Sequence, residues 1–267
     1  MQDGMINIIK TDVIMINKTA LRVIVFYSIA ITLSNVFRFD LLNLHGFIEK
    51  LPTWTMIFIS PLEAIGVLIG ALISLNLLKK ERTITISFFG TSLKWSLLMS
   101  LVPVILLTII GVKGFGSENP HYYGFIAGVS TFIYCFCEEI GWRGYLGEEL
   151  SSISFWKRGL IIAVFWYVWH LSFLMNPDIL NNLKFFGWLL VGSWGISKLV
   201  ELTKSVFVAT CFHMVINIIM FNGFIKDSID FKSKIIILCI CIAAWVPVLI
   251  KWSKEKKASV TTEPLNS

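Results

Sequence analysis

Charged residues are scarce in this chain of 267 residues. Asp, Glu, Lys and Arg together make up 15% of the sequence, whereas an ordinary soluble domain contains about 25%. Hydrophobic residues make up 56%, and the mean hydropathy is +0.76. This balance argues against a soluble enzyme or binding domain. It predicts a membrane protein that crosses the bilayer several times.

Other features are missing as well. The sequence has no HExxH pattern, which many zinc proteases carry on a helix. No internal repeat is evident, which lowers the expectation of a transporter. We expect no disulfide framework, because all five cysteines fall inside predicted spans. These are Cys135, Cys137, Cys211, Cys239 and Cys241. The first apolar stretch begins near Leu21 without a small-residue cleavage site after it, so we expect it to remain as a span.

Eight apolar segments are predicted to span the membrane, which takes about 20 residues each. Their approximate limits are 21–37, 54–78, 94–112, 123–140, 159–175, 185–200, 205–223 and 234–251. The predicted fold class is therefore all-α, a polytopic membrane helix bundle of about eight transmembrane helices. We expect one transmembrane domain, 1–253, followed by a polar cytoplasmic tail, 254–267. Much of the chain before Lys18, and the chain after Lys251, is expected to be disordered.

The net charge is +6, and most of the 23 Lys and Arg residues lie in connections on the side of the N-terminus. Positively charged loops stay in the cytoplasm, so both termini are predicted to be cytoplasmic. Because the basic residues flank apolar segments, anionic lipid is the expected partner and nucleic acid is not. The predicted location is the plasma membrane if the source is a bacterium.

Two adjacent acids, Glu138 and Glu139, stand at the end of the fourth predicted span. Charged side chains are costly in a membrane, so they are functional candidates by default. Glu139 and Arg143 are four residues apart on one helix face and are expected to pair. Glu138 points about 100° away. It is expected to be left free, as suits a general base acting on water. Gly141 and Gly144 are expected to loosen the helix there. The alternative is that the charges only mark a helix end.

The second motif is Trp166-x-x-x-His170, on the fifth predicted span. His170 lies roughly 18 Å from the basic end of that span, at ~1.5 Å per residue, which is near mid-membrane. A lone histidine on an aromatic-rich helix is more often a packing residue than a ligand, and Trp166 and Trp169 agree with that. The motif alone leaves the role of His170 open.

The third motif is His213-x-x-x-Asn217, on the seventh predicted span. The two residues share a helix face, and both can donate hydrogen bonds while uncharged. Two fixed donors aimed at one point are what an oxyanion hole requires. The alternative is a pair that hydrogen-bonds to a neighbouring helix and holds the bundle together.

The estimated depths of the motif residues in the membrane relate the three motifs to one another. Counted at about 1.5 Å per residue, Glu138 and His213 fall in the cytoplasmic half of the membrane, with His170 and Asn217 near the middle. We therefore expect these groups to converge on one cavity that opens to the cytoplasm. The other two of the four histidines fall in predicted loops on the opposite face. Glu63, inside the second predicted span, is either a buried structural acid or part of a substrate path.

In this order on successive spans, Glu-Glu-x-x-x-Arg, an aromatic-x-x-x-His and His-x-x-x-Asn resemble the CPBP family. This family comprises the type II CAAX prenyl endopeptidases and their bacterial relatives, also called Abi proteins. The resemblance covers about residues 120–225, and residues 138–146 (EEIGWRGYL) are its most specific part. In the simplest form of the family pattern, Phe stands where this chain has Trp166. An aromatic wall is preserved.

The resemblance implies a glutamate-dependent intramembrane endopeptidase that uses no cofactor. It implies that Glu138 and His170 activate water, while His213 and Asn217 stabilise the tetrahedral oxyanion. The supporting residues that it implies are Glu139, Arg143 and Trp166, with the arginine orienting the glutamates. Eukaryotic members trim prenylated CAAX tails, and bacterial members are linked to bacteriocin processing, self-immunity and regulation of membrane proteins. The expected partner is therefore a membrane-embedded or lipidated peptide.

Two further readings stay open. Two histidines and a carboxylate can fill three zinc positions and leave a fourth for water, so a zinc-dependent protease using the same residues is one alternative. Asn217, however, is a poor zinc ligand and a good oxyanion donor. The other alternative is not an enzyme: an immunity factor or scaffold that binds a peptide in the same cavity.

Overall fold

The computed structural model describes residues 2–77, 85–113, 119–221 and 228–262, with side chains described for 18–77, 85–113, 119–220 and 228–255. This part of the chain is helical apart from turns, connections and one isolated parallel β-bridge, Ser87 to Ser205. The first half contains α1 (Gln2–Arg38), α2 (His45–Ile48), the 3-10 turn η1 (Thr53–Thr55), α3 (Met56–Ile59), α4 (Leu62–Leu77), α5 (Leu93–Ile110) and α6 (Pro120–Glu139). The second half contains the π-helix η2 (Ile140–Leu146), α7 (Gly147–Glu149), α8 (Phe155–His170), α9 (Ser172–Met175), α10 (Ile179–Thr203), α11 (Val206–Ile216), the π-helix η3 (Asn217–Phe221) and α13 (Phe231–Thr262).

Seven segments of the described chain are long and apolar enough to cross a membrane. They are Lys18–Arg38, Thr53–Leu77, Leu93–Ile110, Pro120–Glu149, Phe155–Met175, Ile179–Thr203 and Phe231–Glu255. The prediction of an all-α polytopic bundle is confirmed, and the chain is an integral multi-pass membrane protein. The predicted span 205–223 corresponds to a shorter apolar helix, Val206–Met220, and its last two residues lie outside the described chain. The count of eight, the single domain 1–253 and the cytoplasmic termini stay predictions.

The predicted disorder at the two ends of the chain is wrong where the structure describes them. Helix α1 already begins at Gln2, and α13 continues past Lys251 to Thr262. The sequence at both ends allows this, because Ile, Met, Lys, Glu and Ala favour helix and no proline interrupts the extensions. A polar segment that continues a membrane helix can stay helical, since the span has already nucleated it.

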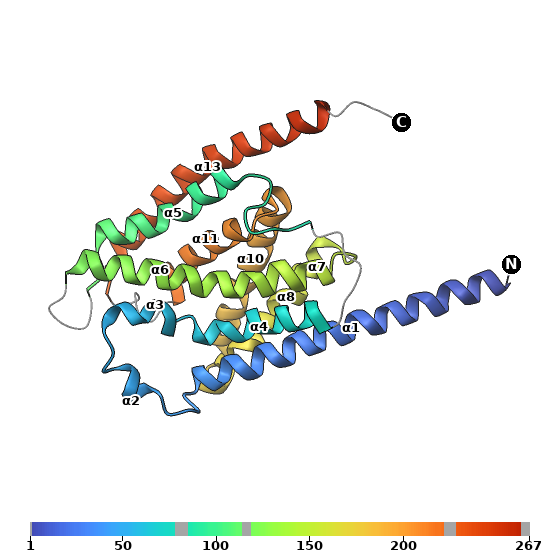
Figure 1. The fold of residues 1–267 in the computed structure, drawn as a ribbon, viewed down its shortest axis with the longest axis horizontal. Helices are drawn as coiled ribbons and strands as arrows, with labels where there is room; N and C mark the ends of the chain where they lie inside the picture. The colour runs from blue at the N-terminus through green and yellow to red at the C-terminus, as the bar shows by residue number, and fades with distance from the viewer. Residues whose placement is uncertain (1, 78–84, 114–118, 222–227, 263–267) are drawn as a thin grey trace.

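Helix α6 lies in the middle of the bundle (Figure 1). On one side it packs against α4, which in turn packs on α1. On the other side it packs against α5, with α13 beyond. Helix α11 also contacts α6, and it carries the third motif opposite the first. The central position of α6 therefore places its last turn where several helices meet.

Helices α1 and α4 pack closely against each other. At Gly66, an added Cβ would lie 2.6 Å from the backbone nitrogen of Ser34 and 2.7 Å from the carbonyl oxygen of Ala30. At Gly70, one turn later, it would lie 2.7 Å from the carbonyl oxygen of Phe26. Gly66-x-x-x-Gly70 is thus a small-residue stripe that lets two antiparallel helices approach closely.

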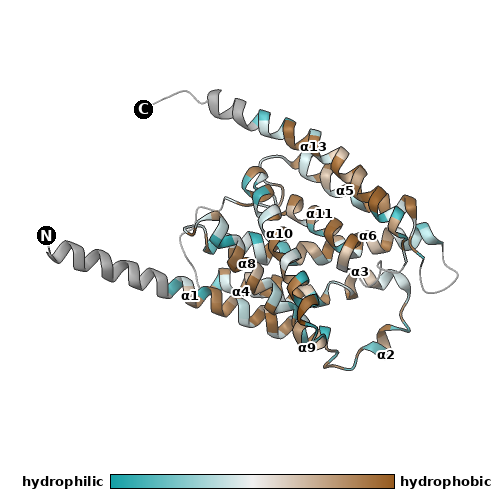
Figure 2. Cartoon of the chain, turned by 180° about the vertical axis from the view of Figure 1, so that it is seen from behind, coloured by the Kyte–Doolittle hydropathy of each residue, from teal (hydrophilic) through white to brown (hydrophobic). Residues whose placement is uncertain are grey.

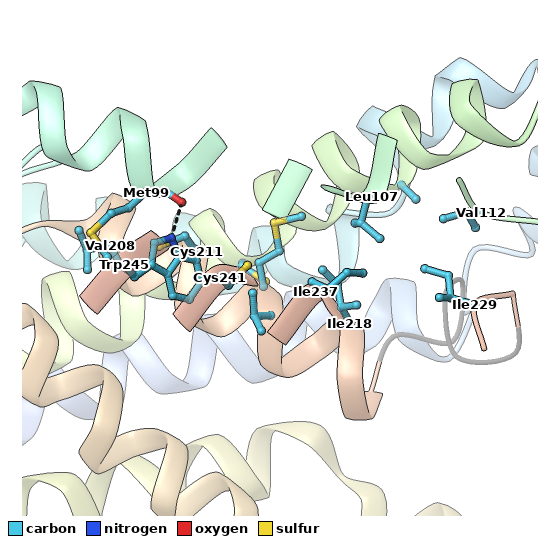
Figure 3. Packing of buried hydrophobic residues seen from close by; sticks show 14 of the residues in the cluster. Met99, Leu107, Val112, Val208, Cys211, Ile218, Ile229, Ile237, Cys241 and Trp245 are labelled. Carbon is cyan, nitrogen blue, oxygen red and sulfur yellow. Dashed lines mark hydrogen bonds between the residues drawn. The ribbon is translucent and has the colours of Figure 1, made fainter. Parts of the chain in front are cut away.

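Two clusters of buried apolar side chains flank the middle of the bundle. One lies mainly between α5, α11 and α13, where the Trp245 indole donates to the Met99 carbonyl at 3.0 Å (Figure 3). The other surrounds η2 and includes Trp142. Tyr134 of α6 and Phe212 of α11 pack against both clusters. Polar residues between the two clusters are therefore covered on both sides by apolar side chains.

The outside of the bundle is apolar as well, as Figure 2 shows by the brown segments along its helices. Ile24, Phe58, Leu101, Ile109 and Trp188 are each at least half exposed in the isolated chain. Such an apolar surface would be unfavourable in water, whereas lipid acyl chains cover it without a cost in free energy.

The start of α11 is held by a short pairing with the segment before α5. Ser205 is the N-cap of α11 and accepts from the backbone of Val208. The backbone N–H of Val206 donates to Ser87, and that of Phe207 donates to Phe88. These bonds satisfy orphan groups at the helix end. They also fix the height at which α11 faces α6.

The α1–α4 contact predicts a test. Gly66→Ala should lower the free energy of unfolding by about 1–3 kcal/mol, because the methyl group meets backbone atoms that cannot turn away. Gly187→Ala, inside α10, is the matched control, since nothing lies within 4 Å of an added Cβ there. It should leave stability unchanged or raise it slightly. Thermal unfolding in detergent measures both. Equal stability of the two variants would contradict the close packing.

Candidate active site

The helix geometry changes at the first motif. Helix α6 ends at Glu139, and residues Ile140–Leu146 form the π-helix η2. The expectation that the helix loosens after the glutamates is thus confirmed, and π segments often occur at functional sites. Gly141 serves close approach, because an added Cβ would collide with Val67 of α4. Gly144 has no such contact, since its Cβ would meet only ordinary van der Waals neighbours.

Glu139 is the centre of a buried charged group. Arg143 Nη1 donates to Glu139 Oε1 at 2.7 Å, as the spacing of four predicts. His213 Nδ1 lies 2.8 Å from the same oxygen, although its ring N–H is not aligned for a hydrogen bond. All three residues are at most 2% exposed. A charge buried this deeply needs a partner, so Glu139 ties η2 to α11.

Glu138 has a different environment. Its Oε2 accepts from the indole of Trp142 at 3.1 Å and from the indole of Trp166 at 2.8 Å. The Tyr134 side chain also hydrogen-bonds to Glu138. The expectation that Glu138 is left free is therefore wrong, although no ion pair to Glu138 occurs in the described chain. Neutral donors thus hold this carboxylate in place.

Trp166 touches more of the site than the predicted aromatic wall implies. Its indole N–H binds Glu138, and the guanidinium carbon of Arg143 lies 4.5 Å from its ring centre. The His213 ring meets it edge-on at 4.9 Å. Its backbone carbonyl accepts from His170. This one side chain and its backbone thus join all three motifs.

The hydrogen bond to the Trp166 carbonyl defines the tautomer of His170. Nδ1 lies 2.7 Å from the Trp166 carbonyl oxygen, one turn back on α8. Because a carbonyl only accepts, Nδ1 carries the ring hydrogen and Nε2 keeps a free lone pair. The ring also packs against Trp169 at 4.8 Å and Phe185 at 5.1 Å. His170 is therefore both packed and equipped with an acceptor.

Asn217 is placed by the antiparallel packing of α6 and α11. Its Nδ2 donates to the Cys135 thiol sulfur at 3.3 Å, while His213 faces Glu139. Two residues four apart on one helix thus meet two residues four apart on the other. Asn217 is also the first residue of the second π segment, η3. The five cysteines are free thiols; Cys239 is exposed, and the other four are buried.

The structure brings the predicted residues together through direct contacts. Glu138, His170, His213 and Arg143 all contact Trp166, and Asn217 follows His213 on the same face. The catalytic roles of these residues stay predictions. The partners that the sequence reasoning missed are Tyr134, Cys135 and Trp142. Each of them is four residues from Glu138 or Glu139, so the helix spacing that paired Glu139 with Arg143 could have found them.

Two cavities flank the site. One of about 640 Å³ lies at the end of α1 and is lined by Glu63 and Tyr123 among mostly apolar residues. The other, of about 150 Å³, is lined by Arg143, Glu148 and Arg158. In the predicted orientation only the smaller cavity is at the cytoplasmic end. Neither of these two cavities is lined by Glu138, His170, His213 or Asn217, so the expectation that these groups converge on one cavity opening to the cytoplasm stays a prediction.

Within the described residues, no group of three or more His, Cys, Asp or Glu side chains is arranged to hold a metal ion. The nearest approach to such a group is Glu139 with His213, and there Arg143 occupies the same carboxylate oxygen.

Comparison with known proteins gives two matches. The model of the family described as "Type II CAAX prenyl endopeptidase Rce1-like" matches residues 120–219, a range that contains all three motifs. A curated relative, the CAAX prenyl protease 2 of Methanococcus maripaludis, is 27% identical over 188 residues. The matched part is 64% of this chain and 60% of the relative, so the chain spans less than two thirds of that relative's length.

The buried ion cluster predicts a stability effect. Arg143→Ala leaves the Glu139 carboxylate buried without its guanidinium, so the free energy of unfolding should fall by about 3–5 kcal/mol. Arg158→Ala is the control, because Arg158 pairs with the partly exposed Glu201 at 2.6 Å. It should cost about 1 kcal/mol or less. Thermal unfolding of both variants in detergent decides this, and a fully stable Arg143→Ala protein would contradict the pairing.

Proposed function

Because residues 120–219 carry a domain of the Rce1-like family of type II CAAX prenyl endopeptidases, we propose that this chain is an intramembrane endopeptidase. Its substrate is a membrane-associated peptide, either a lipidated tail or a bacteriocin-like peptide. The reaction is hydrolysis of one peptide bond by water. In a bacterial source, the location is the plasma membrane.

The observation that carries the proposal is the contrast between two adjacent carboxylates. Glu139 has the Arg143 guanidinium and the His213 Nδ1 on its Oε1. Glu138, also buried, has indole donors on its Oε2 and no cation. A carboxylate held in place without a counter-ion, in a site with little water, is suited to take a proton from a water molecule.

In the proposed reaction, Glu138 removes a proton from water while the water oxygen attacks the scissile carbonyl carbon. His170 Nε2 orients that water as an acceptor, since Nδ1 is engaged with Trp166. The C–N bond then breaks, and the proton on Glu138 passes to the leaving nitrogen. Water and peptide are thereby converted to a carboxylic acid and an amine, with protons balanced.

The oxyanion is proposed to form next to His213 and Asn217. His213 has Nδ1 beside the Glu139 carboxylate, which leaves its Nε2–H to donate to the oxyanion. Asn217 Nδ2 is bound to the Cys135 sulfur, a weak acceptor that an anionic oxygen readily replaces. Arg143 and Glu139 act by positioning these groups. No metal is assigned a role.

The first test compares native chain with Glu138→Gln in cells. Gln keeps the shape and the acceptor oxygen, so the variant should remain inserted while turnover falls by about 10²–10⁴. Mass spectrometry of peptide termini in membrane and secreted fractions should find termini that require the native chain. Glu201→Gln is the matched control, because that acid is bound to Arg158 away from the motifs and should leave the termini unchanged.

The oxyanion assignment should hold in the same assay, with His213→Ala losing the same termini. Retained cleavage in either the Glu138 or the His213 variant would rule out the mechanism. Identical termini in native and Glu138→Gln cells, with the variant stably inserted and the substrate expressed, would favour a peptide-binding scaffold.

A second test concerns the zinc alternative. Purified protein, dialysed against a strong zinc chelator, should keep its cleavage rate within about twofold, because the assigned roles need only protein donors. A zinc protease treated in the same way would be inactive and would regain activity when zinc is added back. Recovery of that kind would replace the metal-independent mechanism.

A further inference from the structure

The cavity of about 150 Å³ lies where η2 and α7 meet the start of α8 and the end of α10. In the predicted orientation this end of the bundle is cytoplasmic. The lining contains three cations, Arg143, Arg158 and Lys204, and two acids, Glu148 and Glu201. Ordinary small-molecule pockets have volumes of roughly 300–1,000 Å³. This cavity is smaller, so it suits a small polar group.

Arg143 lines this cavity, and one edge of its guanidinium has no partner. Its Nη1 donates to Glu139 at 2.7 Å. Its Nε and Nη2 have no hydrogen-bond partner in the described chain, although the side chain is only 1% exposed. Nε–H and Nη2–H point the same way, and together they form the fork that binds an oxyanion through two parallel bonds. Buried donors without an acceptor are costly, and an anion in the cavity removes that cost.

Two more donors in the lining are unused. Ser197 of α10 is 7% exposed, and its Oγ has no hydrogen-bond partner among the described residues. Lys204 follows the last residue of α10, and no ion pair to its ammonium occurs in the part of the chain that the structure describes. The fork of Arg143, a hydroxyl and an ammonium come from two separate segments. A phosphate group, whose oxygens point in several directions, fits such donors better than a planar carboxylate does.

The two acids of the lining are held by donors of their own. Glu148 Oε1 accepts from Thr85 Oγ1 at 2.7 Å and from two backbone N–H groups at 3.1 and 3.2 Å. Glu201 is bound by Arg158 at 2.6 Å and by Lys198 at 3.3 Å. With three cations against two acids, the described lining carries a positive excess that an anion neutralises.

We propose that this cavity binds a phosphate group, with the Arg143 fork, the Ser197 hydroxyl and the Lys204 ammonium as its donors. A phospholipid headgroup and free inorganic phosphate present the same chemistry at this end of the bundle. The bound group holds one edge of Arg143 while Glu139 holds the other. Occupation therefore stabilises the buried ion cluster of the candidate active site. Binding at this cavity does not require the proposed peptidase activity.

The first experiment measures binding through thermal unfolding. Full-chain protein is purified in an uncharged sugar detergent without phosphate, and sodium phosphate is compared with sodium chloride at equal ionic strength. Phosphate at about 100 times its Kd should raise the unfolding midpoint by about 5 °C, because a ligand that binds only the folded state stabilises it.

A second titration separates the two sources of phosphate. The same protein receives micelles that contain phosphatidylglycerol or, as the control, an uncharged glycolipid without phosphate. A shift with phosphatidylglycerol alone identifies a lipid headgroup, and a shift with inorganic phosphate identifies a free anion. No shift with either phosphate source would leave the cavity to water only and overturn the proposal. Equal shifts with both lipids and none with inorganic phosphate would also contradict it, since acyl chains alone would then account for the effect.

Three variants locate the site. Lys204→Gln should raise the Kd of the phosphate source that binds by about tenfold, as expected for the loss of a charge-assisted hydrogen bond. Lys157→Gln is the matched control, because Lys157 is an exposed residue next to Arg158 that is not part of the lining. It removes the same charge and should change the Kd by less than about twofold. Equal weakening by these two variants would mean general charge attraction and would rule out the site.

The third variant, Ser197→Ala, has two readouts. Without phosphate its unfolding midpoint should stay the same or rise slightly, because the change removes a buried hydroxyl that has no partner in the described chain. With phosphate the Kd should rise by about threefold or more. An unchanged Kd would contradict the role of this hydroxyl, and if Lys204→Gln does not fold, Ser197→Ala decides. Because binding is read from unfolding, an absence of peptide cleavage would count against the proposed function and leave the phosphate site in place.

Discussion

The interaction on which the site depends is the burial of the Glu139 carboxylate with Arg143 and His213. A charge in a membrane bundle is tolerated only when opposite charge and donors lie within contact distance. Meeting that condition requires α6, η2 and α11 to adopt one register. In that register, the side chain of Glu138, next to Glu139, can point in only one direction. The structural pair thus determines where the buried carboxylate of its neighbour lies.

In that register, Trp166 brings residues of all three motifs into contact. An indole is large, apolar and carries one N–H donor, so it can pack inside a hydrocarbon core and still bind a carboxylate. Here it binds Glu138, lies beneath Arg143 and meets the edge of His213. The family pattern has Phe at this position, which offers the ring but not the N–H. This chain therefore adds a donor to its proposed base, with the Trp142 indole as a second one.

The two π-helical segments explain how regular helices can present these groups. Each π segment lies at a motif residue. The segment η2 follows Glu139, and η3 begins at Asn217. A π turn widens the helix and shifts the phase of the side chains after it. The close α1–α4 packing and the two apolar clusters hold the surrounding helices in place.

The sequence by itself determined the all-α membrane bundle, because hydropathy and span length follow directly from composition. It also determined the Glu139–Arg143 pair, since both residues are on one helix at a spacing of four. It did not predict that His213 faces Glu139, that Asn217 meets Cys135, or that Trp166 binds Glu138. Those contacts join residues on different helices, and their register depends on how α6, α8 and α11 pack. Only the tertiary structure decided them, because side-chain spacing along one helix carries no information about the height of its neighbour.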